Sequence, residues 1–109
     1  MSTHASAEAW RHVPALSKVE ADRLTRSRAN LVQFVVDRFK ETFGVAVEDT
    51  NVEAFPDGLT ITLVADVPPH PKYNVWGHAI SRMFADAGAE PPISVIVRES
   101  KELLEAPTR

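Results

Sequence analysis

The chain has 109 residues, 44% of them hydrophobic and 25% charged, as expected of an ordinary globular protein with one domain. Its formal net charge of −3 combines seven Lys and Arg against four Asp and Glu in residues 1–40 with five against eleven in the remainder. This division fits either two solvated surfaces or complementary contact with a charged partner. The absence of cysteine excludes disulfides, thiolate metal sites and a cysteine nucleophile.

The start of the chain lacks the basic stretch and apolar core of a secretory signal, and no apolar run is long enough to span a bilayer. We therefore expect a cytoplasmic protein without a membrane segment. Residues 1–16 are predicted to be a loosely ordered segment that docks through Trp10, Val13 and Leu16. A single α+β domain is expected over residues 17–109.

The first helical pattern runs from Lys18 to Phe43. Ser17 and Glu20 have the spacing of a capping box at its start, and Gly44 is placed to end it. We expect one helix here, with a break near Ser27 as the alternative, because this serine also has the chemistry of an N-cap.

An apolar stripe along this helix is predicted to face a sheet. Its members are Val32, Val35, Val36, Phe39 and Phe43, continued backward by Arg28, Leu24 and Ala21. Phe34 points about 160° away from Val32 at 100° per residue. We expect it to be covered by Trp10 and Val13 or to belong to a partner surface.

Residues 59–67 alternate apolar and polar side chains, which is the pattern of a strand with one buried face. This is the expected central strand. Residues 45–55 form a weaker strand with a bulge expected at Glu48 and Asp49, and Pro56-Asp57-Gly58 is a turn sequence that closes a hairpin.

Three prolines within residues 68–73 make a stiff connector, and Asn74 is the expected N-cap of a second helix that ends before Gly88. Residues 93–97 form a short strand whose proline start is typical of a sheet edge. A last helical turn is expected at Leu103 and Leu104.

The predicted fold is α+β: a two-layer α-β-β-α-β sandwich with a three-stranded mixed sheet in the order 1-2-3. The right-handed crossover rule makes the third strand parallel to the second and puts both helices on one face. This order resembles half of a ferredoxin-like fold, and it is similar to that of the cytoplasmic domains of cation-efflux transporters and of RNA-binding KH domains. The KH glycine loop is missing, so the resemblance is one of topology alone.

The sequence favours no catalytic machinery. The four glycines are all used at helix ends, in a turn or in the second helix, which leaves no glycine-rich phosphate loop, and no hydrolase motif is present. An enzyme is therefore less expected than a binding protein. Nucleic acid is not an expected partner either, because Glu20 and Asp22 interrupt the basic residues around Arg23 and Arg26.

Two binding sites remain as hypotheses. The first is the sheet face opposite the helices, with Thr60, Thr62 and Val64 beside Ile96 or Val95; together with Phe34, Arg23 and Arg26 it predicts a non-catalytic interaction or assembly domain, with a homodimer as the expected form. The alternative is a regulatory domain that uses the 66–78 connector. Its candidate ligands for a divalent transition metal are Asp66, His70 and His78, and Tyr73 and Trp76 are the candidate walls of a small-ligand pocket. The pattern of the second helix also places Trp76 on its core face, and this is the favoured interpretation of that residue.

Overall fold

The computed structural model describes residue 10 and residues 13–100. Its three strands form one open mixed sheet in the order β1-β2-β3. They are β1 (Val47–Phe55), β2 (Gly58–Ala65) and β3 (Ile93–Glu99). β1 is antiparallel to β2, and β2 is parallel to β3. The predicted fold class and strand order are confirmed.

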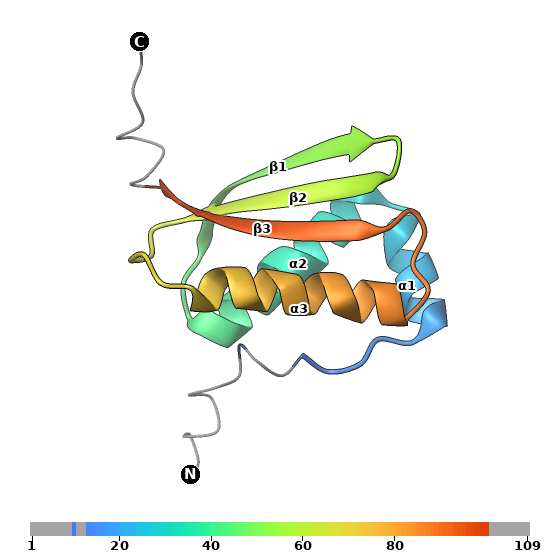
Figure 1. The fold of residues 1–109 in the computed structure, drawn as a ribbon, viewed down its shortest axis with the longest axis horizontal. Coiled ribbons are helices and arrows are strands. Elements are labelled where there is room, and N and C mark those ends of the chain that lie inside the picture. The colour runs from blue at the N-terminus through green and yellow to red at the C-terminus, as the bar shows by residue number, and fades with distance from the viewer. Residues whose placement is uncertain (1–9, 11–12, 101–109) are drawn as a thin grey trace.

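Three helices cover the sheet instead of the two that were expected. They are α1 (Lys18–Thr25), α2 (Arg28–Phe43) and α3 (Lys72–Asp86). Figure 1 shows all three on the same side of the strands, with α3 running along β3. The result is a two-layer molecule whose other sheet face has no helix over it in the part that the structure describes.

The prediction of one continuous helix over residues 18–43 is wrong, and the alternative break at Ser27 is confirmed. Ser27 has an extended backbone and its Oγ accepts a hydrogen bond from the Asn30 N–H at 3.2 Å, as an N-cap does. Ser17 caps α1 in the same way through the Glu20 N–H. A serine that bonds the backbone three residues ahead competes with continued helix, so the chain starts a new one.

The buried stripe of α2 differs in part from the predicted one. The fully buried residues of α2 are Leu31, Val35 and Phe39, whereas Arg28 is exposed at the first position of the helix. At 100° per residue Arg28 still lies on the side of these three residues, so its exposure goes with its place at the start of α2 and not with a change of helical phase.

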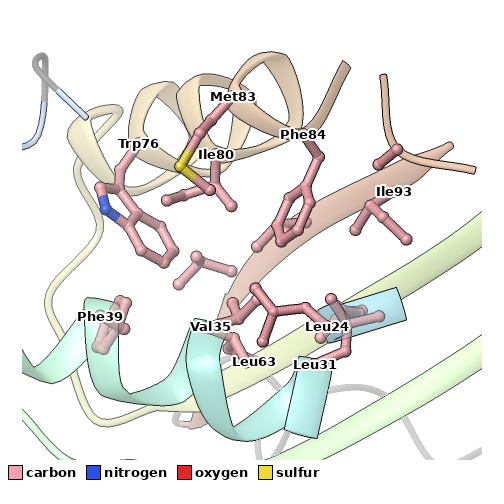
Figure 2. Packing of buried hydrophobic residues seen from close by; sticks show 14 of the residues in the cluster. Leu24, Leu31, Val35, Phe39, Leu63, Trp76, Ile80, Met83, Phe84 and Ile93 are labelled. Atoms are coloured by element: carbon pink, nitrogen blue, oxygen red, sulfur yellow. The ribbon is translucent and has the colours of Figure 1, made fainter. Parts of the chain in front are cut away.

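The core lies between the helices and one face of the sheet. Ile61, Leu63 and Ala65 of β2 are fully buried, as the alternating pattern predicted. Figure 2 shows core side chains of the three helices and of the sheet pointing toward one another: Leu24, Leu31, Val35, Phe39, Leu63, Trp76, Ile80, Met83, Phe84 and Ile93. Trp10, Val13 and Leu16 pack against this core, which agrees with their expected docking.

The bulge predicted in the first strand is present as a register shift between Val47 and Asp49. The start of α3 differs from the prediction. The helix begins at Lys72, and the Nδ1 atom of His70 accepts the Lys72 N–H at 3.0 Å, so His70 has the bonding role that was expected of Asn74.

α3 lies unusually close to β3. A Cβ on Gly77 would stand 2.6 Å from the carbonyl oxygen of Val95, so only glycine fits there without a shift of the backbone. Four residues on, the Ser81 Oγ donates to the Gly77 carbonyl at 2.9 Å and accepts the Val95 N–H at 3.0 Å. This contact holds the middle of β3 against the helix.

No helix within residues 13–100 is both long and apolar enough to cross a bilayer. The last helical turn expected at Leu103 and Leu104 falls outside the described residues, as does most of the segment 1–16. The division into that segment and a domain over 17–109 stays a prediction.

Candidate interaction surface

The sheet face that points away from the helices is the largest surface that the sequence singled out, and we call it the open face. Strand alternation and the pairing register place on it the following residues: Asp49, Asn51, Glu53 and Phe55 of β1; Thr60, Thr62 and Val64 of β2; Ser94, Ile96 and Arg98 of β3. They form rows across the sheet. One row is Asn51, Thr62 and Ile96, so the predicted threonine lies between an amide and an apolar side chain.

The open face is partly apolar. Ile96 is 41% exposed and Phe55 is 49% exposed, although large hydrophobic side chains are usually buried. Thr60, Thr62 and Val64 between them are half-buried by their neighbours in the sheet. The structure thus places the predicted trio where no described helix covers it; that it contacts a partner stays a prediction.

Charge is unevenly distributed over the open face. Asp49 and Glu53 lie on β1, and Arg98 lies on β3. The row that contains Asp49 continues through Val64 to Arg98, so acid and base stand on opposite sides of an apolar centre. The face therefore has an acidic side strand and a basic one.

Phe34 does not belong to this face. It lies on α2, half-buried, with its ring centroid 5.9 Å from that of Phe84 on α3 in an edge-on contact. The guanidinium of Arg38 lies 5.1 Å from the ring centroid on another side. The ring is therefore half-covered by α3 and by its own helix, and the expected cover by Trp10 and Val13 stays a prediction.

Arg23 and Arg26 lie on α1 and so belong to the helical layer. The Arg23 guanidinium is hydrogen bonded to Glu20, and this bond and the adjacent negative charge raise the pKa of Arg23. Arginine is protonated at ordinary pH in any case, so the raised pKa does not change the charge of Arg23. The six residues expected to form one surface thus lie in separate places, and only the β2 trio shares the open face.

The connector residues also separate. His70 and Tyr73 line a depression of about 310 Å³ together with Val67, Asn74 and residues 96–99. Trp76 is only 1% exposed and belongs to the core, so it is not a wall of this depression. The indole packs against α2, with the ring centroids of Trp76 and Phe39 5.4 Å apart, so its interpretation as a core residue is confirmed.

The metal hypothesis gains no support from the geometry. Within the described part of the chain, no three His, Asp or Glu side chains come together as a metal site requires, so Asp66, His70 and His78 form no such group. His70 already uses its Nδ1 atom as an acceptor for the Lys72 N–H.

Sequence reasoning placed none of the β1 residues on the open face, and the exposed Phe55 is the apolar one among them. The bulge shifts the alternation of β1, and counting from the half-buried Val52 places Phe55 on the opposite side, three residues on. Counting from the end of the strand nearest the turn would have found it.

The comparisons with known proteins found no matching family, no similar curated protein and no similar solved structure.

Proposed function

We propose that the protein is a non-catalytic interaction domain that associates with a second copy of itself through the open face. The observation that carries this proposal is the apolar centre of an uncovered sheet face, with Phe55 and Ile96 exposed on either side of β2. Antiparallel and mixed sheets often leave one face to water, but that face is then polar along its whole length. Phe55 and Ile96 lie two strands and four residues apart on this face, and exposed apolar side chains on an uncovered sheet face favour a contact surface.

The charges on the open face favour a second copy as the partner. We consider two copies whose open faces lie against each other, related by a two-fold axis parallel to β2. This arrangement places β1 of one copy over β3 of the other. The acidic side chain of Asp49 then meets Arg98 at the same level along the strands, and Val64 meets Val64 of the other copy. An axis across the strands would instead set acid over acid.

The open face is small, so the association is expected to be weak. Strands about 4.8 Å apart with about 3.3 Å per residue give a face of roughly 300 Å² in projection. Stable interfaces bury about 800 Å² of accessible surface on each partner. We therefore propose that the protein assembles in a concentration-dependent way.

Because the sequence contains no cysteine, the fold has no need of an oxidising compartment, and we propose the cytoplasm as its location.

An acidic substitution at Ile96 tests the proposed surface. Light scattering after gel filtration should show a mass that rises from 12.0 kDa toward twice that value as concentration increases. Ile96→Glu puts a charge into the contact of both copies, so we expect the apparent Kd to rise about tenfold or more, which corresponds to about 1.4 kcal/mol.

Val75→Glu is the matched control, because Val75 is 44% exposed on α3 and Ile96 is 41% exposed on the open face. The control should associate like the unmodified protein. A monomer at every concentration would refute the proposed self-association. Equal weakening by both substitutions would refute the assignment to the open face.

A further inference from the structure

The two outer edges of the sheet differ in whether another part of the described chain covers them. On β3, the outward N–H of Val95 is bonded to the Ser81 Oγ, and the Val95 carbonyl faces Gly77 at close range. α3 therefore occupies the middle of this edge and blocks the addition of another strand.

The edge of β1 has no such cover within the described residues. The Leu59 N–H donates to the Pro92 carbonyl, so odd-numbered residues of β2 turn their peptide groups toward β3 and even-numbered ones toward β1. The β1 partners of the even-numbered β2 residues, which include Asn51 and Glu53, turn their peptide groups toward β2. The residues between these partners turn their peptide groups outward: Thr50, Val52 and Ala54.

One of these outward groups is already bonded. The Thr50 N–H donates to the Asp49 carboxylate at 2.9 Å. The N–H groups of Val52 and Ala54 and the three carbonyls point to the side of β1 where the sheet has no further strand. A strand edge with free peptide groups is a template for another strand.

We propose that a second copy of the chain pairs with this edge, antiparallel, about a two-fold axis at Val52, to form a continuous six-stranded sheet. This inference rests on the proposed self-association and specifies a second contact for it. The pairing would leave all helices on one side of the long sheet and would join the two open faces into one surface of twice the width.

The acidic residues of β1 select the register. With the axis at Val52, Glu53 of one copy lies opposite Asn51 of the other, and Asp49 lies opposite Phe55. No acid faces an acid. The outward peptide groups of Val52 meet each other, and the Ala54 N–H meets the Thr50 carbonyl. The Ala54 carbonyl meets the Thr50 N–H, which has to exchange the Asp49 carboxylate for it.

The neighbouring registers fail on charge or on hydrogen bonding. An axis at Asn51 sets Asp49 opposite Glu53, and an axis at Glu53 sets the two Glu53 side chains against each other, which destabilises a cross-strand pair. An axis at Ala54 sets Val52 opposite Pro56, which has no N–H. An axis at Thr50 extends the pairing into the bulge between residues 47 and 49.

A second copy fits this edge in one register without an acid facing an acid, and the alternative occupant is a basic extended peptide. The acidic residues Glu48, Asp49 and Glu53 would attract a basic peptide, whose binding weakens with added salt. Pairing of two acidic strands is instead strengthened by salt, because the net repulsion between the copies is screened. The Asp49–Arg98 contact proposed on the open face also weakens with salt, so the sign is read at the edge itself, from the amide exchange of Val52, where it separates the two occupants.

Single-cysteine variants test the register, since the chain has no other thiol. Asn51 and Glu53 are both exposed, and in the Val52-centred register they form a non-hydrogen-bonded pair with Cα atoms about 4.5 Å apart. That distance lies within the range of disulfides. We expect a mixture of Asn51→Cys and Glu53→Cys to give mainly the mixed disulfide under mild oxidation, identified by its intact mass.

Each variant alone, and Ala85→Cys on the exposed side of α3, should cross-link at a low background rate. Glu53→Cys alone is a stringent control, because loss of the acid removes the repulsion that disfavours the competing registers. Preferential homodimers of Asn51→Cys or of Glu53→Cys would overturn the register. Cross-linking of the mixture at the Ala85→Cys rate would overturn the edge contact.

A measurement without thiols keeps the proposal testable if cysteine disturbs the strand. Amide exchange of Val52 and Ala54 should slow about tenfold or more as protein concentration rises, because pairing protects their N–H groups, while Asn51, already bonded within the sheet, should change little. No concentration dependence at Val52 would contradict the pairing. If the edge contact fails while Ile96→Glu still weakens association, the open-face proposal stands without it.

Discussion

At the scale of single residues, the closest contact between the two layers depends on the lack of a side chain at Gly77. The helix and the strand meet there through backbone atoms, with the Val95 carbonyl 2.6 Å from the position of a Cβ. The sequence pattern does not indicate this close contact, because a glycine in the first turns of a helix is also found where no neighbour requires it. The close approach follows from tertiary packing and becomes visible only in the structure.

Gly77→Ala should therefore destabilise the protein even though alanine is the better helix former. Alanine gains about 1 kcal/mol in a helix over glycine, but overpacking against backbone costs about 1–3 kcal/mol and also strains the Ser81 bond to Val95. We expect a net loss of about 1 kcal/mol in the free energy of unfolding, measured by urea denaturation. His78→Ala, the neighbouring exposed position, should be neutral or slightly stabilising. A gain in stability from Gly77→Ala would show that α3 and β3 are not in close contact.

At the scale of elements, the strands were predictable and the helix boundaries less so. Residues 59–67 alternate cleanly because one face of β2 is fully buried, and the turn and the bulge have local chemical signals. The break at Ser27 was only one of two interpretations, because a serine within an amphipathic run permits either a continued helix or a new start. The structure decides between them: Ser27 has an extended backbone and its Oγ accepts the Asn30 N–H, so a new helix starts there.

The cap at Ser27 predicts a measurable cost. Ser27→Ala removes the acceptor of the Asn30 N–H at the start of α2 and should lower the free energy of unfolding by about 1 kcal/mol. Ser27→Asp keeps an acceptor at the same place and should stay close to the unmodified protein. Urea denaturation measures both, and equal stability of Ser27→Ala and the unmodified protein would contradict two separately capped helices.

The candidate site was less predictable than the fold. The trio on β2 was placed on the uncovered face by alternation alone, whereas Phe34 is covered by α3 and Trp76 by α2, each far away in sequence from the residue that it covers. Aromatic residues on a helix bury against whatever packs beside them, and a helical pattern gives the direction of a side chain without its neighbour.

At the scale of the whole molecule, the sheet is covered on one face and closed at one edge. The helices bury the inner face, and α3 blocks β3, so the open face and the edge of β1 are the two parts of the sheet left uncovered within the described residues. The open face suits a second copy through its opposite charges, and the edge of β1 through the register that keeps its acids apart. The central claim is that self-association uses these strands and not the helical layer.

Amide NMR spectra recorded over a range of protein concentrations test this claim most directly, because each shift reports on one residue. We expect concentration-dependent shifts at Thr62, Val64 and Ile96 on the open face and at Val52 on the edge. The exposed Val19 and Val75 of the helical layer should keep their positions. Shifts confined to the helices, or spectra that do not change with concentration, would contradict the account.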